Sequence, residues 1–209
     1  MSVASGFDRL APWYDGLVKL AFGREVYRAQ VQWLDRIPAG ARVLIIGGGT
    51  GWILSEVLRR SQASQVTYLE ISEGMLVQTR QRMQREGWPL ERYVLRRGSW
   101  QDLSEEETYE AVLTFFFLDL FKEAEVRNLM WALSQRVDKQ GVWLFADFLP
   151  VNRGQRWLLQ LMYAFFRRAC GISGQQLLPY DRLFNELGWA LQQEMHFAQK
   201  MIRSRWYQQ

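Results

Sequence analysis

The apolar residues of this chain fall into short continuous runs, separated by longer segments with a helical period. The runs cover residues 42–46, 65–69, 92–95, 109–116 and 141–146. A continuous run of branched residues, such as Arg42-Val-Leu-Ile-Ile46, is typical of a strand buried on both faces of a parallel sheet. Helices are predicted where apolar positions recur every three or four residues, at 52–60, 74–86 and 122–137. Strands that alternate with helices predict right-handed crossovers and a doubly wound α/β fold.

The two ends of the chain follow other patterns. Residues 7–40 predict a helical lead-in, in which a helix from Phe22 to Ile37 ends at Pro38 and Gly40. Beyond Asp147 the pattern predicts two helices and then a terminal antiparallel strand pair, at 153–168, 181–187, 189–197 and 201–207. We therefore predict a single domain over residues 1–209.

The composition narrows the function classes. The chain has 209 residues, of which 48% are hydrophobic and 23% charged, the profile of an ordinary folded protein. One cysteine and one histidine provide neither a disulfide framework nor the ligands of an ordinary zinc site. The first residues resemble no secretory signal, and the apolar runs fall short of the roughly 20 residues that span a bilayer. We expect a cytoplasmic protein without a metal.

The net charge of +4 is unevenly distributed. Residues 151–209 contain eight basic and three acidic residues, whereas residues 41–150 contain thirteen basic and fifteen acidic residues. This balance is not typical of nucleic-acid-binding proteins, which are usually more basic. A basic C-terminal quarter suits an anionic substrate or surface, or is a scatter of solvated arginines.

A glycine cluster follows the first predicted strand. Gly47-Gly48-Gly49-Thr50-Gly51 lies at a strand-to-helix turn, where glycines let a ligand approach the main chain. A dinucleotide fingerprint G-x-G-x-x-G would need glycine at position 52, where this chain has tryptophan. The spacing G-x-G-x-G resembles motif I of class I S-adenosylmethionine-dependent methyltransferases, which implies that Gly47, Gly48, Gly49 and Gly51 bind that cofactor.

An acid ends the second predicted strand. Glu70 lies 19 residues after Gly51, and a carboxylate there can accept hydrogen bonds from both hydroxyls of a ribose. The string Glu70-Ile71-Ser72-x-x-Met75 resembles the corresponding methyltransferase motif, which implies that Glu70, Ile71 and Met75 contact the cofactor. The alternative is that Glu70 only caps the following helix.

The third element is Gly98-Ser99-Trp100-Gln-Asp-Leu103. It resembles the adenine-contacting segment of the family and implies that Ser99 and Trp100 lie at the adenine. Two positions depart from the family pattern: Ser99 replaces the usual acid, and Ile45 stands where family members usually have an acid two residues before the first glycine.

The fourth element is the strand at 109–116, which resembles the F-D-x-V strand of the family. Its carboxyl end opens onto the cleft where ligands of open α/β sheets bind. The resemblance implies that Phe115 and Phe116 flank the cofactor, and packing within a buried strand is the alternative.

The N-terminal segment Phe7-Asp-Arg-Leu-Ala-Pro-Trp-Tyr14-Asp15 resembles the opening of methyltransferases that act on quinone precursors and on phosphatidylethanolamine. The resemblance covers residues 7–150. It implies a Rossmann-like, mostly parallel seven-stranded sheet with an antiparallel C-terminal strand, and a lid residue at Tyr14. Residues 1–40 are then a lid, residues 41–150 the cofactor-binding core and residues 151–209 the substrate cap. An arm that anchors the terminus is the alternative for the lid.

The predicted helix at 153–168 is apolar nearly all round. Its central run from Trp157 to Phe166 is flanked by arginines, at positions 153, 156, 167 and 168. Such a helix is buried under the C-terminal strands, covers an apolar substrate, or lies in a membrane interface. We expect a substrate cap, with peripheral membrane contact through residues 153–168 as a further hypothesis.

The catalytic residues remain unassigned. His196 has no visible partner, and Cys170 follows two arginines that could lower its pKa. If the acceptor is a carbon acid or a phenol, a base is needed, and Asp119 and Asp147, near the carboxyl ends of strands, are candidates for it. The sequence predicts methyl transfer from S-adenosylmethionine to a small apolar or lipid-like acceptor. The alternative is a non-catalytic relative that serves as a nucleotide-binding, membrane-binding or partner-binding module, which the departures at Ile45 and Ser99 favour.

Overall fold

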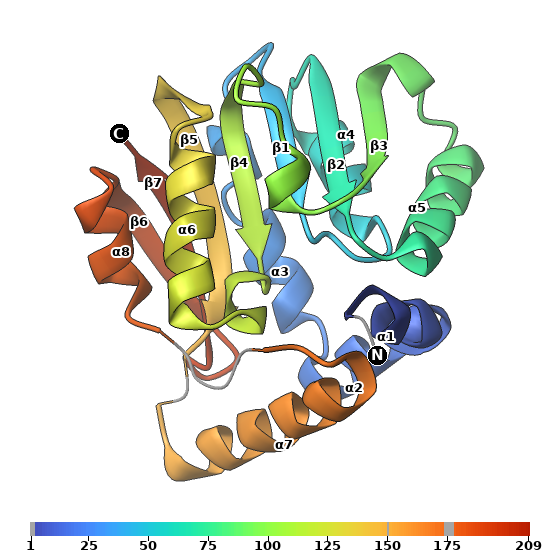
Figure 1. Ribbon diagram of the computed structural model, residues 1–209, viewed down its shortest axis with the longest axis vertical. Coiled ribbons are helices and arrows are strands. Elements are labelled where there is room, and N and C mark those ends of the chain that lie inside the picture. Colours follow the sequence, from blue (N-terminus) through green and yellow to red (C-terminus); the bar gives the residue numbers. More distant parts are fainter. Residues whose placement is uncertain (1–2, 150, 174–177) are drawn as a thin grey trace.

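The computed structural model describes residues 3–149, 151–173 and 178–209. Seven strands form one sheet in the order β3-β2-β1-β4-β5-β7-β6 (Figure 1). Their bounds are β1 Arg42–Ile46, β2 Gln65–Glu70, β3 Tyr93–Arg97, β4 Tyr109–Phe115, β5 Val137–Phe148, β6 Ala190–Phe197 and β7 Ile202–Gln208. Strands β1 to β5 are parallel, and β7 is antiparallel to both of its neighbours. The predicted fold is confirmed.

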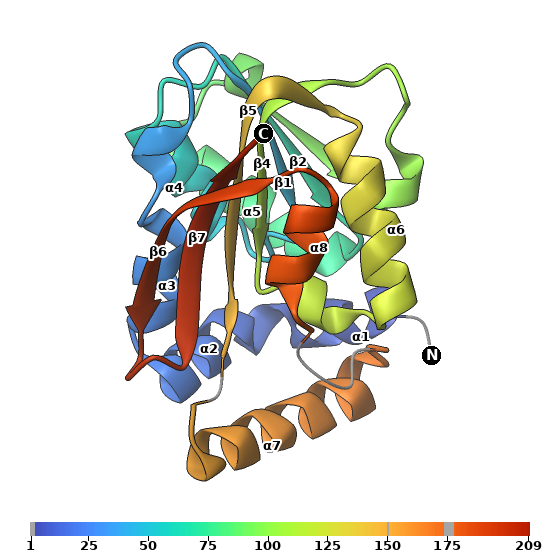
Figure 2. The same cartoon turned by 90° about the vertical axis from the view of Figure 1, so that its left-hand side faces the viewer.

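Helices cover both faces of the sheet. In the view along the sheet, α3 (Glu25–Val31) and α4 (Trp52–Arg60) lie on one side, and α6 (Glu123–Ser134) and α8 (Tyr180–Glu186) lie on the other (Figure 2). Alternate residues of β1 serve the two sides: Val43 and Ile45 join the apolar cluster that contains α4, while Leu44 and Ile46 join the one that contains α6. Because both faces are buried, the strand reads as a continuous apolar run.

The register brings three strand ends together. Ile45 lies opposite Tyr68 of β2 and Leu113 of β4, so β1 is the central strand of this group. The chain continues from β1 to β2 on one side and reaches β4 on the other. The carboxyl ends therefore meet where the strand order reverses, which is the place where ligands bind in open α/β sheets.

The N-terminal lead-in is more broken than the sequence predicts. It consists of α1 (Val3–Leu10), α2 (Tyr14–Phe22) and α3, so the prediction of one helix from Phe22 to Ile37 is wrong. Gly23 ends α2 with φ +60° and ψ −131°, a conformation that is open to glycine because it lacks a Cβ atom.

Helix α7 (Arg153–Cys170) lies below the carboxyl ends of the strands and alongside α1 and α2 (Figures 1 and 2). Leu159, Tyr163 and Cys170 are buried, whereas Trp157 and Leu161 are exposed. The helix therefore has one buried face and one exposed face. The alternative of burial under the C-terminal strands is wrong, because α7 packs against α1 instead. Helix α5 (Glu73–Glu86) completes the fold beside β2 and β3.

Candidate functional site

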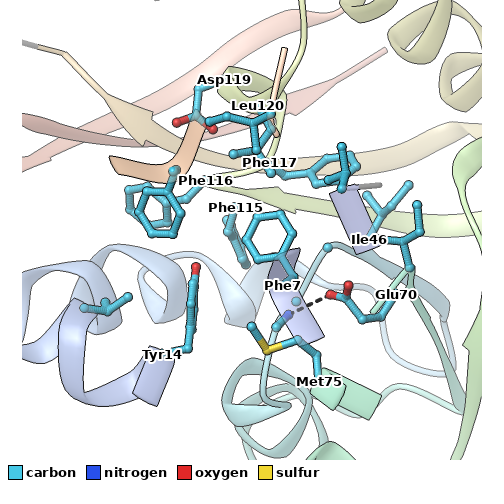
Figure 3. Close-up of a pocket in the computed structure, with 18 of the residues that line it drawn as sticks. Phe7, Tyr14, Ile46, Glu70, Met75, Phe115, Phe116, Phe117, Asp119 and Leu120 are labelled. Carbon is cyan, nitrogen blue, oxygen red and sulfur yellow. Dashed lines mark hydrogen bonds between the residues drawn. The ribbon is translucent and has the colours of Figure 1, made fainter. Parts of the chain in front are cut away.

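A cavity of about 810 Å³ lies between the carboxyl ends of β1, β2 and β4 and the helices α1, α2 and α7, and Figure 3 shows residues that line it. Of the twelve candidate residues from the sequence, eleven line it: Tyr14, Gly47, Gly48, Gly49, Glu70, Ile71, Met75, Ser99, Trp100, Phe115 and Phe116. These residues come from segments that are up to about a hundred positions apart in the chain. The topology of the sheet brings them to one place.

The glycine loop between β1 and α4 is held from behind by Tyr68 and Thr79. The Tyr68 hydroxyl donates to the carbonyl oxygen of Gly49 at 2.8 Å and accepts from the N–H of Gly51 at 3.1 Å. Thr79 Oγ1 donates to the same Gly49 carbonyl at 3.2 Å. These bonds fix the loop, in which Gly47, Gly49 and Gly51 all have positive φ.

Gly51 is the one candidate that does not line the cavity. It is the residue before α4, with φ +82°, and a Cβ atom there would lie 2.6 Å from Thr79 Cγ2. Glycine is therefore needed at position 51 so that the loop can pack against α5. At Gly49, in contrast, a Cβ atom would meet only the Tyr14 ring, at 3.5 Å.

Glu70 places a carboxylate in the cavity wall, where its side chain is almost fully buried. Its Oε2 accepts from the N–H of Gly49 at 3.2 Å, and its Oε1 accepts from the N–H of Ser72 at 3.0 Å. Burial raises the pKa of Glu70 to about 7, against the effect of these hydrogen bonds. Ser72, whose Oγ accepts from the N–H of Met75, is the cap of α5, so the reading of Glu70 as that cap is wrong.

The side chain of Ser99 is already engaged. Its hydroxyl lies 3.1 Å from both Gln101 Oε1 and Asp102 Oδ2, and the Asp102 carboxylate also accepts from the Ser99 N–H at 2.7 Å. Trp100 begins the short 3-10 helix that Ser99 precedes. Ile45, at the other departure from the family pattern, is 1% exposed and belongs to the core.

Asp15, which sequence reasoning missed, attaches the N-terminal segment to the glycine loop. Its Oδ1 accepts from the Thr50 hydroxyl at 2.6 Å, and its Oδ2 pairs with Arg82 of α5 at 2.9 Å. Tyr14 is thereby held over Gly49, and burial raises the pKa of its phenol well above the ordinary value. In the sequence, the only indication of this role is that Asp15 directly follows the aromatic residues Trp13 and Tyr14.

Asp8 provides a second attachment. Its Oδ1 accepts from the Ser72 hydroxyl at 2.6 Å and from the Gly74 N–H at 2.9 Å, at the start of α5. A carboxylate is favourable there because the first N–H groups of a helix lack partners within it. The N-terminal segment is therefore fixed at two points over the cavity.

The far end of the cavity is apolar. Phe116, the residue after β4, has a positive φ of 52°, which is strained for a residue other than glycine. Its ring lies 4.9 Å from that of Phe148, measured between centroids. The lining at this end includes side chains from α2 and α7: Leu17, Val18, Leu158, Leu161, Met162, Phe165 and Phe166. The cavity thus has a polar end at Glu70 and an apolar end next to α7.

Asp119 is the buried acid of the apolar end. It lines the cavity, is 3% exposed and accepts from the Tyr163 hydroxyl at 2.8 Å through Oδ2. Burial raises its pKa to about 6. Asp147, the other candidate from the sequence, is equally buried but is not among the lining residues. Burial and the neighbouring Asp119 raise the pKa of Asp147 as well.

The remaining candidates lie apart from this chemistry. Cys170 is fully buried, and burial raises its pKa to about 11, so the expectation that arginines lower it is wrong. His196 does have a partner, because its Nε2 lies 3.3 Å from Glu194 Oε1. Among the described residues, we find no group of three or more histidine, cysteine, aspartate or glutamate side chains that could hold a metal ion.

Comparison with known proteins finds one family that resembles part of the chain. Residues 43–141, from β1 to the middle of β5, match the model of a family described as a methyltransferase domain. No curated protein matches the sequence.

Solved structures of similar fold are numerous. The mitomycin 7-O-methyltransferase MmcR is 14% identical, with a TM-score of 0.69 over 90% of this chain and 54% of its own. An O-methyltransferase family 2 protein from Planctomyces limnophilus, in complex with apigenin, is 14% identical, with a TM-score of 0.71 over 92% of this chain and 61% of its own. The magnesium protoporphyrin IX methyltransferase from Synechocystis, with bound S-adenosylmethionine, is 18% identical, with a TM-score of 0.62 over 85% and 74%. The chain thus spans little more than half the length of the first two.

Proposed function

We propose that this chain, which contains a methyltransferase domain, transfers a methyl group from S-adenosylmethionine to a small apolar acceptor. The observation that carries the proposal is the arrangement of the cavity. A buried carboxylate and a glycine loop form one end, and aromatic and aliphatic side chains form the other. The domain match supports the reaction class, and it weighs against the alternative of a non-catalytic binding module.

The residues fit the cofactor. Gly49 leaves its main chain open toward the cavity, because a Cβ atom there would meet only the ring of Tyr14. In this proposal Glu70 accepts hydrogen bonds from the ribose hydroxyls, and Ser99 and Trp100 lie beside the adenine. The other lining candidates complete the walls around it: Gly47, Gly48, Ile71, Met75, Phe115 and Phe116.

The cofactor supplies a methyl group that is already activated by its positive sulfur. The chain therefore has to align the acceptor with that methyl group and exclude water. Helix α7 and the N-terminal segment close the acceptor end. Asp8 and Asp15 hold the N-terminal segment in place.

For the acceptor, we infer a small aromatic or lipid-like molecule. The apolar lining favours such a compound, because burial of apolar surface supplies most of the binding free energy. The N-terminal resemblance to methyltransferases of quinone precursors and phosphatidylethanolamine supports this class. The Planctomyces protein is similar in fold and was crystallised with apigenin, a polyphenol.

Titration calorimetry with S-adenosylhomocysteine tests the proposal. We expect the wild-type chain to bind this product of the reaction with a 1:1 stoichiometry. NADH is the control ligand, because a dinucleotide fingerprint would need a glycine where Trp52 stands. Binding of NADH together with no binding of S-adenosylhomocysteine would refute the proposal.

We also propose that α7 contacts an anionic membrane surface. Between Phe148 and Tyr180 the sequence contains four arginines and no acidic residue. All four arginines are exposed, and none forms an ion pair within the described part of the chain. Trp157, Leu161 and Phe165 are exposed on the same helix, at 63%, 48% and 47%, and the last two also border the cavity. No helix in residues 3–149, 151–173 and 178–209 is long and apolar enough to cross a membrane, and an exposed helix of this composition suits an interface.

Liposome sedimentation checks this contact. We expect binding that rises with the content of anionic lipid and falls with salt, since exposed charges are screened over about 8–10 Å near physiological ionic strength. Replacing Arg167 and Arg168 by glutamine should weaken the binding about thirtyfold, at about 1 kcal/mol per arginine. Replacing Arg59 and Arg60 on α4 by glutamine is the matched control and should leave the binding unchanged. Sedimentation that does not depend on lipid composition would contradict the membrane contact.

A further inference from the structure

Two carboxylates and two tyrosines are buried together at the apolar end of the cavity. Asp119 belongs to the 3-10 helix Leu118–Leu120 that follows β4, and Asp147 belongs to β5. Tyr163 of α7 and Tyr180 of α8 are buried beside them. Of the two acids, only Asp119 is among the residues that line the cavity.

One oxygen of Asp119 has a partner and the other does not. Oδ2 accepts from the Tyr163 hydroxyl at 2.8 Å, whereas Oδ1 is buried without a hydrogen-bond partner among the described residues. A buried, unsatisfied carboxylate oxygen is costly, and a donor that reaches it through the cavity would remove that cost. Figure 3 shows Asp119 beside Leu120 and the Phe115–Phe117 aromatics, across the pocket from Glu70.

We propose that the acceptor is a phenol or a similar apolar hydroxyl compound, and that Asp119 Oδ1 takes its proton during methyl transfer. This inference rests on the proposed function. The acceptor O–H bond breaks and its proton passes to Asp119, while the acceptor oxygen forms a bond to the methyl carbon. The electron pair of the broken S–C bond stays on sulfur and neutralises its positive charge. The products are a methyl ether, a neutral thioether and a protonated Asp119, which then returns its proton to water.

The surroundings of Asp119 suit a base at neutral pH. Burial raises its pKa to about 6, and the hydrogen bond from Tyr163 opposes that rise. The other titratable groups that face it are Asp147, Tyr180 and Tyr14. Asp119 is therefore ionised at pH 7 and yet more basic than an exposed aspartate, which brings its pKa close to the working pH. Tyr163 acts as a positioning residue, because it holds one carboxylate oxygen of Asp119, while the other oxygen has no partner among the described residues.

Binding of a matched pair of probes tests the proposal without turnover. The probes are 2-naphthol, which has a hydroxyl donor, and 2-methoxynaphthalene, which lacks it. With S-adenosylhomocysteine present, calorimetry should give about tenfold tighter binding of the naphthol to the wild type at pH 7.5, as expected for a hydrogen bond to a charged group. The preference should decline below about pH 6, as Asp119 becomes protonated.

The variants separate this role from a structural one. Asp119→Asn should lose most of the preference and all of its pH dependence, because the neutral amide oxygen accepts a weaker hydrogen bond and does not titrate. The ether should bind as in the wild type. Tyr163→Phe should keep the preference but move its pH midpoint upward, because a hydrogen bond that lowers the pKa of Asp119 is lost. Asp147→Asn, which removes the buried acid outside the lining, should keep the preference.

Two results would overturn the inference: a naphthol preference that is undiminished in Asp119→Asn, or a wild type that binds the probes equally or not at all. If the wild type binds S-adenosylhomocysteine in such a case, the proposed function stands and only the role of Asp119 fails. If it does not bind S-adenosylhomocysteine, the proposed function fails first.

Discussion

Replacing Glu70 by glutamine is expected to weaken S-adenosylhomocysteine binding by about 1.5–3 kcal/mol, which is roughly tenfold to a hundredfold. The proposed ribose hydroxyls donate to the ionised carboxylate, and glutamine removes that charge while keeping the size of the side chain. Calorimetry on both proteins at pH 8 measures the difference.

The same carboxylate should make binding dependent on pH. Because burial raises the pKa of Glu70 to about 7, the free protein is largely protonated there at pH 6. Binding that needs the ionised form should weaken by up to about tenfold for each pH unit below 7. In Glu70→Gln this dependence should disappear. If the wild type and Glu70→Gln bound S-adenosylhomocysteine with equal affinity at pH 8, the assignment of Glu70 to the ribose site would be wrong.

The free energy of unfolding should depend on pH in the direction opposite to ligand binding: it should fall, and not rise, as Glu70 becomes ionised. A carboxyl whose pKa is raised by folding binds more protons in the folded state than in the unfolded one, so its contribution to stability is lost as pH rises from about 4.5 to 7. Glu70→Gln should therefore unfold at higher denaturant concentration than the wild type at pH 8. We expect a gain of roughly 1–2 kcal/mol, after allowing for one hydrogen bond that the amide cannot accept. The gain should vanish at pH 4.

Glu110 is a control for Glu70, because its pKa is lowered by folding and not raised. It lies at the amino end of β4, away from the cavity, and pairs with Arg42. Although burial raises its pKa, the hydrogen bonds from Arg42 leave it below the ordinary value. Glu110→Gln should leave S-adenosylhomocysteine binding unchanged. The stability that its ionised form contributes is present above its unfolded pKa and is lost as pH falls through its lowered folded pKa.

Valine substitutions in the glycine loop should separate binding from folding. Gly49→Val is expected to abolish detectable S-adenosylhomocysteine binding while the chain stays folded, because the new side chain points into the cavity beside Tyr14. Gly51→Val should instead destabilise the chain by about 3 kcal/mol or more, since its Cβ atom would overlap Thr79 in addition to the strain of a positive φ. Chemical denaturation and calorimetry measure the two effects.

Gly40→Val is the matched control for backbone strain. Gly40 has φ +74°, close to the values in the loop, but nothing lies within 4 Å of its Cβ position. It precedes β1 at the edge opposite the cavity. This variant should show the cost of the positive φ alone, roughly 1–2 kcal/mol, and should bind S-adenosylhomocysteine normally. If Gly49→Val binds like Gly40→Val, the glycine loop is not the cofactor site.

The order of strands and helices could be predicted from the sequence because both faces of the sheet are buried. Val43 to Ile46 had to be continuously apolar, and that run is visible without a structure. The glycine loop and Glu70 were equally visible, since a tight turn and a strand end impose residue types at fixed spacing. Local geometry determined these features, so the local sequence records them.

Only the tertiary structure decided which side chains meet across long separations. Tyr163 reaches Asp119 from 44 positions away, and Arg82 reaches Asp15 from 67. No period or spacing along the chain encodes such a contact, because it depends on where whole helices pack. The same holds for α7, whose apolar residues predicted a substrate cap but not that the helix packs against α1.

The difference between what the sequence predicted and what only the tertiary structure decided follows from the range of the interactions involved. Backbone conformation and the alternation of apolar positions act within a few residues, so they determined the elements and the cofactor-binding turn. The placement of α7 depends on how its apolar face packs against α1, over more than 140 positions. The sequence by itself determined a doubly wound sheet with a glycine loop, and the packing of distant helices decided that a buried acid, Asp119, lies at the apolar end of the cavity.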